Sequence, residues 1–441
     1  MLTGSDPAPT GNAFADFVSR AHRAGRLVVQ PRMGFSDPRV MRSALLAVRG
    51  AAATTAGTLT LDSYTRVGDH ESARQALVTG TPLNGYPLVA HGRRTNRAVL
   101  TGVSDVDFPV QVRHGSAIPQ RIMTALLRAG LDATEGGPVS YCLPYGRTPL
   151  RHSVRNWEES CAVLGQLREA GIEPHVETFG GCLMGQLCPP SLLVAVSLLE
   201  ALFFKQHGLR TVSLSYAQQA NPQQDREALR ALRTLATRYL GDIDWHLVVY
   251  AYMGLFPRTG AGALLLLEEA AKLAVECGAA RLIVKTVAES ARIPSVAENV
   301  QALETANLAA LGTSRLPEPA GPESGVLAEA GALVRGVLEL DGDVGRALVE
   351  AFRLGRLDVP FCLHPDNARR TRSHLGADGR LSWADIGGLP IGDVTTARGG
   401  PAPGSAELLS ALSFVRDEFD RAAAARSGKQ WRTTTPIGRT T

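Results

Sequence analysis

The sequence predicts an α/β fold, a (β/α)8 TIM barrel with a C-terminal accessory α+β region. Eight short apolar or β-branched runs alternate with helical stretches before residue 312. Each strand and helix together take about 35 residues, which is the spacing of a (β/α)8 barrel. A doubly wound open sheet is the alternative, but no G-x-G-x-x-G motif follows the first strand. Because that motif is typical of nucleotide-binding open sheets, the barrel is favoured.

The predicted strands are short runs rich in Val, Ile, Leu, Thr and aromatic residues, which favour extended structure. In chain order they cover residues 27–29, 58–61, 108–112, 138–143, 174–179, 211–216, 246–252 and 281–286. Because helices separate them, we expect the strands to be parallel, with their C-terminal ends at one mouth of the barrel.

The predicted helices carry apolar residues at i, i+3 and i+4 spacing, and several end at a glycine suited to the position after a helix. They cover residues 36–50, 117–130, 156–171, 191–208, 224–240, 261–278 and 295–312. A further apolar stretch at 86–92 fits a long connection between the second and third strands.

The chain is predicted to have four parts. They are a flexible lead-in (1–24), the catalytic barrel (25–311), the accessory region (312–428) and a disordered basic tail (429–441). A linker bearing proline and glycine follows residue 312 and marks the end of the barrel. The accessory region is expected to hold a helical pair around 325–355, an irregular segment and an amphipathic helix near 405–425.

Composition and charge favour a soluble cytoplasmic protein. A formal charge of +4 over 441 residues argues against nucleic acid as the main partner. No apolar run approaches the ~20 residues of a membrane-spanning helix, and the first residues lack the pattern of a signal peptide. The six cysteines form no C-x-x-C pair, so we expect free buried thiols and predict no metal site.

Charged and aromatic residues gather where the predicted strands end, which is where barrel enzymes carry their active sites. In chain order they are Arg32, Arg66, Arg113, His114, Glu135, Tyr141, Tyr145, Glu177, Phe179, Met253, Lys285 and Glu289. Lys285 stands out because only four of the 46 basic residues are lysine.

Three arginines at one mouth suit a small molecule with two carboxylates, because a guanidinium matches a carboxylate with two parallel hydrogen bonds. Glu135 and the two tyrosines could then receive an ammonium group and position the carbon chain. The pattern indicates an acidic amino acid, glutamate or aspartate, as the ligand.

Each of these residues also has a plainer interpretation. An arginine at a strand end is often a surface residue paired with a nearby acid, and the two tyrosines could simply fill the rim. Lys285 and Glu289 could form a solvated i, i+4 pair worth about 0.3–0.5 kcal/mol. His91 and His114 each precede a glycine, and they could fix their loops by hydrogen bonds rather than take part in catalysis.

A series of short motifs runs through the predicted barrel: "LVVQPRMGFSDP", "LDSYTR", "LNGYPLVAHG", "VRHGS", "EGGPVSYCLPY", "LCPPS" and "LIVKTVAESARIP". In this order and spacing they resemble the large catalytic (epsilon) subunit of methylaspartate mutase, also called glutamate mutase. The similarity covers residues 25–311 and returns at 358–361 and 387–390.

The resemblance implies the catalytic subunit of an adenosylcobalamin-dependent isomerase that interconverts L-glutamate and (2S,3S)-3-methylaspartate by a radical mechanism. It also implies a homodimer of this chain, and a separate small subunit that carries the corrinoid and caps the barrel mouth, which together make a heterotetramer. This chain lacks the usual cobalt-ligating motif D-x-H-x-x-G, so we expect the small cobalamin-binding subunit to supply it.

The resemblance also assigns roles to individual residues. Those that would bind the substrate are Arg32, Arg66, Arg113, Glu135, Tyr141 and Tyr145. Those that would bind the cofactor are His114, Phe179, Met253, Lys285 and Glu289, with the last two near the adenosyl ribose and Phe179 facing the corrin. The catalytic candidates are Glu135, Lys285 and Glu289.

The chain departs from the family pattern mainly on the cofactor-facing rim, where Thr178 replaces a proline and "SYAQQAN" replaces a glycine-richer stretch. Two alternatives therefore stay open. One is a barrel enzyme that acts on another acidic amino acid without cobalamin, and the other is a non-catalytic homologue that binds a dicarboxylate.

Overall fold

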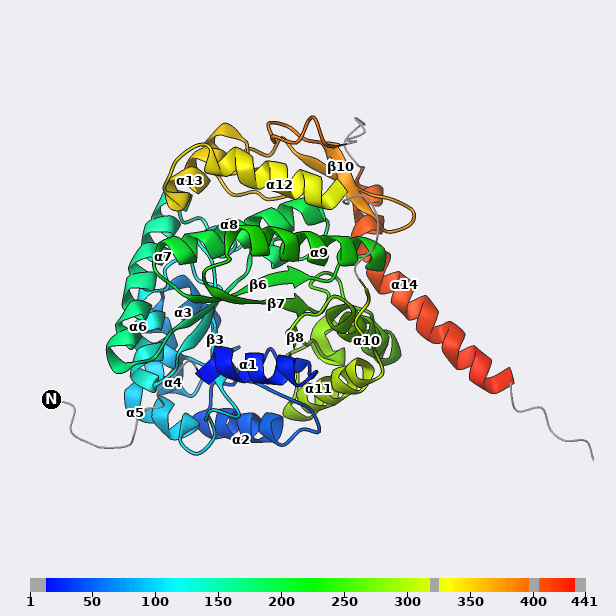
Figure 1. The fold of residues 1–441 in the computed structure, drawn as a ribbon. Coiled ribbons are helices and arrows are strands. Elements are labelled where there is room, and N and C mark those ends of the chain that lie inside the picture. Colours follow the sequence, from blue (N-terminus) through cyan, green and yellow to red (C-terminus); the bar gives the residue numbers. More distant parts are fainter. Residues whose placement is uncertain (1–12, 318–324, 396–403, 433–441) are drawn as a thin grey trace, which may run out of the picture.

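The computed structural model describes residues 13–317, 325–395 and 404–432, and its centre is a ring of eight parallel strands surrounded by helices (Figure 1). Strands β2 to β8 pair in sequence order, and β1 pairs with β8. Hydrogen bonds from Val29 N to Thr54 O (2.9 Å) and from Ala56 N to Val29 O (3.4 Å) join β1 to the residues that lead into β2. Because the ring closes and every neighbour is parallel, the predicted (β/α)8 barrel is confirmed and the open sheet is excluded.

The strands are β1 (Val28–Gln30), β2 (Gly57–Thr60), β3 (Val110–Arg113), β4 (Ala133–Gly136), β5 (His175–Thr178), β6 (Thr211–Ala217), β7 (Asp244–Tyr250) and β8 (Arg281–Ile283). Seven of the predicted strands overlap these. The prediction of the fourth strand at 138–143 is wrong, because β4 lies earlier and ends at Gly136.

Residues 138–143 form a turn instead of a strand. Cys142 N and Leu143 N both donate to Val139 O (3.1 and 3.0 Å), so the backbone curls back on itself. Pro138 has no N–H to give to a strand ladder, and the φ of +136° at Gly136 suits only glycine. The run is apolar because the turn is buried, and burial alone does not distinguish a strand from a turn.

The barrel helices are α2 (Pro38–Arg49), α5 (Leu88–Leu100), α6 (Gln120–Ala129), α7 (Leu150–Gly165), α8 (Pro190–Gln206), α9 (Pro222–Tyr239), α10 (Gly260–Glu276) and α11 (Val296–Leu311). The connection between β2 and β3 also holds α3 (Ser63–Val67) and α4 (His70–Thr79). Short 3-10 turns are η1 (Gln166–Ala170), η2 (Gly180–Cys182) and η3 (Val287–Ser290). Helix α8 is apolar on almost every side because it lies between the barrel strands and the accessory region.

A helix closes the N-terminal end of the barrel, where a flexible lead-in was predicted. Helix α1 (Ala13–Arg23) buries Phe14, Phe17 and Val18 against residues at the starts of the strands, such as Val28 and Ala133. The prediction for residues 1–24 is therefore wrong for 13–23, whereas residues 1–12 lie outside the described part of the chain.

The accessory region covers one side of the barrel. Its elements are α12 (Gly325–Leu338), α13 (Val344–Leu354), the antiparallel hairpin of β9 (Arg372–Leu375) and β10 (Leu381–Asp385), and α14 (Ser405–Arg432). Helix α12 lies across α8, and α14 runs along α10 and extends away from the body (Figure 1). Because α14 continues to Arg432, the predicted tail 429–441 is wrong for its first four residues, and 433–441 lie outside the described residues.

All six cysteines are free and buried, as predicted. Within the residues that the structure describes, no group of three or more His, Cys, Asp or Glu side chains is arranged to hold a metal ion. In the same described part, no helix is both long enough and apolar enough to cross a membrane.

Candidate active site

The residues proposed from the sequence meet at the C-terminal ends of the strands. Arg113 and Glu135 lie on β3 and β4, and Arg32 and Lys285 follow β1 and β8 by two residues. The charge of Arg32 acts on Glu135, Tyr145 and Lys285, and that of Arg66 acts on His114 and Tyr145. These side chains therefore share one mouth, which is the arrangement that the strand positions predicted.

Glu135 is the buried acid at the centre of this mouth. Its side chain is 2% exposed, and its Oε2 lies 2.6 Å from Nη2 of Arg113. The Tyr141 hydroxyl donates to Oε1 of the same carboxylate. Burial raises the pKa of Glu135 to about 7, although the charge of Arg113 opposes the rise. Glu135 therefore changes charge close to neutral pH, where its ionised form can accept an ammonium group.

Arg113 is held between two carboxylates. Besides Glu135, it reaches Glu177, with 3.4 Å from Nη1 to Oε1. Its guanidinium also lies over the Tyr250 ring, 5.0 Å from the centroid. Burial alone would lower the pKa of Arg113, but the charges of Glu135 and Glu177 raise it above its ordinary value. Arg113 is therefore a fixed positive charge in the floor of the mouth.

Arg32 and Arg66 differ from Arg113 because neither guanidinium forms an ion pair with a carboxylate of the described residues. Nη1 of Arg32 lies 3.8 Å from Sδ of Met253. Nε of Arg66 is buried and has no hydrogen-bond partner in the described part of the chain. A buried donor without a partner is costly, so these two groups suit an anionic ligand.

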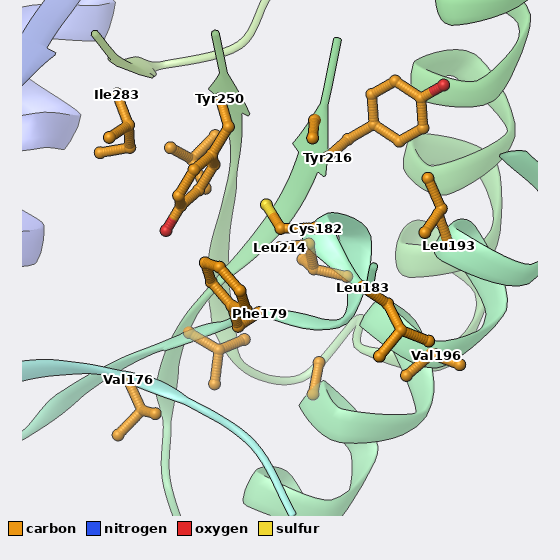
Figure 2. Close-up of a cluster of buried hydrophobic side chains, with 14 of the residues drawn as sticks. Val176, Phe179, Cys182, Leu183, Leu193, Val196, Leu214, Tyr216, Tyr250 and Ile283 are labelled. Atoms are coloured by element: carbon orange, nitrogen blue, oxygen red, sulfur yellow. The ribbon is translucent and has the colours of Figure 1, made fainter. Parts of the chain in front are cut away.

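Four aromatic rings make one wall of the mouth. The centroid of Tyr141 is 4.9 Å from Phe179 and 6.0 Å from Tyr145, and Phe179 is 5.5 Å from Tyr250. Figure 2 shows Phe179, which follows β5, next to Tyr250 at the end of β7. Tyr141, Phe179 and Tyr250 are buried and strengthen the electrostatic interactions beside them, whereas Tyr145 is 44% exposed at the rim.

Gly137, the second glycine after Glu135, makes room for a buried acid that the sequence analysis missed. Glu200 of α8 accepts hydrogen bonds from Ser140 N (2.8 Å), Val139 N (3.2 Å) and Phe179 N (3.3 Å). A Cβ on Gly137 would overlap the Glu200 carboxylate. Glu200 therefore ties the loop that carries Tyr141 to the end of β5. Its signal in the sequence is a lone acid in the apolar stretch of α8.

Lys285 and Glu289 form a pair with 3.5 Å between Nζ and Oε2. The solvated alternative does not hold, because Lys285 is only 7% exposed and its Nζ lies 5.1 Å from the centroid of the Phe256 ring. Burial lowers the pKa of Lys285 to about 8, and the charge of Glu289 limits the fall. The pair offers one donor and one acceptor side by side, which suits neighbouring hydroxyl groups.

His114 follows β3 and is buried, as Arg113 and Glu135 are. Its ring stacks on Trp157 (centroids 5.7 Å apart), meets the edge of Tyr141 (5.2 Å) and accepts a hydrogen bond from Ser116 N (3.0 Å). Burial, together with the charges of Arg66 and Arg113, lowers the pKa of His114 to about 3. These contacts fit the loop-fixing interpretation, and the cofactor-binding role of His114 stays a prediction.

A buried polar layer below the mouth was also missed. Arg281 pairs with Glu177 and donates to Gln30 Oε1 (2.6 Å), Ser213 Oγ (2.9 Å) and His246 Nε2 (3.1 Å). Tyr250 donates to Glu177 from β7, two strands along the ring. The available signal was the presence of charged residues inside otherwise apolar predicted strands, since buried charges in a barrel require partners.

The accessory region braces the loop that follows β4. Arg147 Nη1 donates to Leu363 O (2.9 Å), His364 Nε2 lies 3.0 Å from Thr148 O, and Leu150 N donates to Asp366 Oδ2 (2.6 Å). A hollow of about 420 Å³ lies between residues 143–147 and 361–364. The accessory region thus helps to set the position of the tyrosine-bearing loop.

Known proteins with similar sequences belong to one family. The family model "Methylaspartate mutase E chain" matches residues 8–398. The glutamate mutase epsilon subunit of Haloarcula marismortui is 31% identical over 431 residues, 93% of this chain and 86% of that protein. The protein of the same name from Halobacterium salinarum is 32% identical over 351 residues (76% and 72%), and that from Escherichia coli O157:H7 is 29% identical over 400 residues (87% and 82%).

Proposed function

The chain belongs to the methylaspartate mutase E chain family, and we propose that it is the catalytic subunit of an adenosylcobalamin-dependent isomerase that interconverts L-glutamate and (2S,3S)-3-methylaspartate. The observation that carries the proposal is the charge arrangement at the mouth. Two guanidinium groups, Arg32 and Arg66, have no ion-pair partner among the described residues. Arg32 acts on the buried carboxylate of Glu135, and Arg66 lies at the same mouth, where its charge acts on Tyr145. This is the complement of a molecule with two carboxylates and one ammonium group.

In the proposed complex Arg32 and Arg66 bind the two substrate carboxylates, and Arg113 offers its remaining N–H groups from the floor. Each such pair can form two charge-assisted hydrogen bonds. Glu135 accepts the ammonium group, and the Tyr141 hydroxyl holds the carboxylate in place. Tyr145 and Phe179 cover the carbon chain and keep water away from it.

The residues at the β7 and β8 side fit the adenosyl part of the cofactor. Lys285 and Glu289 would hold its ribose hydroxyls, because the buried pair presents a donor next to an acceptor. Met253 and Phe179 would line the adjoining apolar surface. When bound, the cofactor would supply the radical chemistry that removes and returns a hydrogen atom, while this chain binds and orients the substrate.

The family relationship also motivates the proposed assembly. We expect a small cobalamin-binding subunit to cover the mouth, and two copies of this chain to associate in a heterotetramer with two small subunits. The name "epsilon subunit" of the relatives points to a partner for those proteins, and the missing D-x-H-x-x-G motif points to one here.

The proposal is tested by reconstitution. The purified chain is mixed with a cobalamin-binding small subunit from a curated relative and with adenosylcobalamin, and conversion of glutamate into 3-methylaspartate is followed by mass spectrometry. We expect turnover only when all three components are present. No turnover with a small subunit that is active with its own partner would contradict the proposal, and turnover without any corrinoid would favour the cobalamin-free alternative.

A further inference from the structure

Tyr250 has no role in the proposed function so far, yet it touches both buried acids of the mouth. It is fully buried at the end of β7, and its hydroxyl donates to Oε1 of Glu177. The same hydroxyl oxygen lies 3.2 Å from Oε2 of Glu135. Figure 2 shows Tyr250 turned into the barrel beside Phe179, whereas Tyr216 on the neighbouring strand points outward.

The groups that face Glu135 come from five elements. They are Arg113 on β3, Glu177 on β5, Tyr250 on β7, Tyr141 in the loop after β4 and Arg32 after β1. Two carboxylates near one another favour uptake of a proton by one of them. Glu177 resists this because Arg281, Arg113 and Tyr250 outweigh its burial and keep its pKa low. A proton taken up by this pair of carboxylates therefore binds to Glu135 rather than to Glu177.

A protonated Glu135 would be a poor site for a substrate ammonium group, because it would have lost its charge and one of its acceptor positions. The Tyr250 hydroxyl opposes that outcome. The hydroxyl has one hydrogen, which it can donate to Glu177 or to Oε2 of Glu135. Donation to Glu135 stabilises its ionised form and lowers its proton affinity, as the charges of Arg113 and Arg32 also do.

We propose that Tyr250 is a specificity-determining residue: its hydroxyl bridges Glu177 and Glu135, and so keeps the Glu135 carboxylate charged and ready for the ammonium group of an amino-acid substrate. This inference rests on the proposed function, because it presumes that Glu135 receives that group. Tyr250 acts through Glu135, and it is therefore a positioning residue rather than a catalytic one.

The inference makes a prediction that separates amino acids from simple diacids. Glutarate has the two carboxylates of glutamate but no ammonium group, so its binding should not need an ionised Glu135. Loss of the hydroxyl in Tyr250→Phe should therefore affect glutamate and leave glutarate unchanged. A general loosening of the barrel would weaken the binding of both ligands.

The experiment is calorimetric titration of the full-length chain with glutamate and with glutarate between about pH 6 and about pH 8.5, a range that spans the ionisation of Glu135. In Tyr250→Phe we expect glutamate to bind about tenfold more weakly at the acid end, because a rise of one unit in the pKa of Glu135 corresponds to a tenfold change. At the alkaline end the affinity of the variant for glutamate should approach that of the unsubstituted chain. Tyr216→Phe is the matched control. Its hydroxyl is also fully buried and donates to a carboxylate, Oδ1 of Asp225 (2.8 Å), but outside the mouth.

The outcomes distinguish the two proposals. If Tyr250→Phe shows the same pH dependence for glutamate as the unsubstituted chain, or weakens glutarate equally, the role of Tyr250 is overturned while the proposed function stands. If the unsubstituted chain binds glutamate no better than glutarate at any pH, both fall. Should Tyr250→Phe fail to fold, Glu177→Gln replaces it: removal of the facing charge must extend tight glutamate binding to lower pH, and an unmoved profile overturns the proposal.

Discussion

We expect Arg66 to be required for binding but not for folding. Its short helix α3 is capped by the side chain of Asp62, whose Oδ1 accepts from Thr65 N (2.9 Å). The guanidinium itself forms no ion pair with the described residues, and its Nε lacks a hydrogen-bond partner there. The stability of the chain therefore gains little from the charge of Arg66, and substitution should be visible mainly in function.

Arg66→Lys should lower kcat/KM for glutamate by about tenfold to a hundredfold. An ammonium group cannot form the two parallel hydrogen bonds that a planar guanidinium forms with a carboxylate. The midpoint of thermal unfolding should stay the same. Steady-state kinetics of the reconstituted enzyme and a thermal melt measure the two quantities. The control is Arg353→Lys, which changes an arginine paired with Glu350 on the surface of α13. Unchanged kinetics in Arg66→Lys would remove Arg66 from the site.

The pH dependence of the reaction should reflect two groups of the mouth. Glu135, with its pKa raised to about 7, must be ionised to accept an ammonium group, so activity should fall as the pH drops through that value. Lys285, with its pKa lowered to about 8, must be protonated to donate to the ribose as a cation, so activity should also fall above that value. We expect a bell-shaped profile of kcat/KM with its maximum between the two limbs.

A substitution can assign the alkaline limb. Lys285→Arg keeps the positive charge over the whole range, since a guanidinium does not lose its proton. The variant should therefore retain the acid limb and lose the alkaline one, whatever its absolute rate. An alkaline limb that survives in Lys285→Arg would show that another group titrates there.

The residues of the site differ in how well the sequence could predict them. Arg32, Arg113 and Lys285 lie at or near the ends of correctly predicted strands, so the strands were enough to bring them to one mouth, although their roles stay predictions. Glu135 precedes the run predicted as the fourth strand, and only the observed β4 carries it to the mouth. Tyr250 and Arg281 lie within strands, and their contacts with Glu177 join β5, β7 and β8. Such contacts depend on the register and curvature of the closed sheet, which no local pattern contains.

At the scale of elements, the alternation of eight strands with helices was visible in the sequence, because apolar residues recur at different intervals in helices and in strands. The errors at α1 and β4 have a shared physical cause. The apolar face of α1 has its partner surface only in the finished barrel, and the apolar run after β4 is buried as a turn around Glu200. In both places tertiary packing decides what a short apolar run becomes.

Gly137→Ala should test the close contact between the β4 loop and α8. The new methyl group would displace the Glu200 carboxylate and break its hydrogen bonds to Val139 N and Ser140 N. We expect a loss of at least about 2 kcal/mol in the free energy of unfolding, because buried donors would lose their partner. Urea denaturation measures the change.

Gly342→Ala serves as the control for that substitution, because a Cβ at Gly342 would meet nothing within 4 Å and its φ is not positive. It should leave the free energy of unfolding almost unchanged. Equal stability of the Gly137 and Gly342 variants would contradict the packing that we describe around Glu200.

At the scale of the whole molecule, the accessory region supports the barrel mouth at two separate places. Its segment 361–366 holds the loop after β4, as shown by the bonds of His364 and Asp366. Helix α14 supports the β7 side, where Val415 packs with Tyr252 and Phe256, and Phe256 in turn contacts Lys285. The accessory region is therefore part of the framework of the mouth rather than an independent appendage.

Asp420 is the polar link between α14 and the barrel. Its carboxylate accepts from Arg258 N, Thr259 N (3.0 Å each) and the Thr259 hydroxyl (2.5 Å), where α10 begins. Asp420→Ala should lower the free energy of unfolding by about 1–2 kcal/mol, since backbone donors at a helix start lose their acceptor. Asp417→Ala, which removes a half-exposed acid paired with its neighbour Arg416, should change it by less than about 0.5 kcal/mol.

The effect of Asp420 should also depend on pH in a defined direction. Burial alone would raise the pKa of Asp420, but the hydrogen bonds from Thr259 and Arg258 hold it below its ordinary value of 3.8. The carboxylate therefore contributes stability above that value and loses it as the pH falls through the lower pKa of the folded state. Thermal melts of Asp420→Ala and the unsubstituted chain should differ most at neutral pH and converge in acid. A difference that stayed constant down to about pH 3 would show that the carboxylate charge does not hold α14 against the barrel.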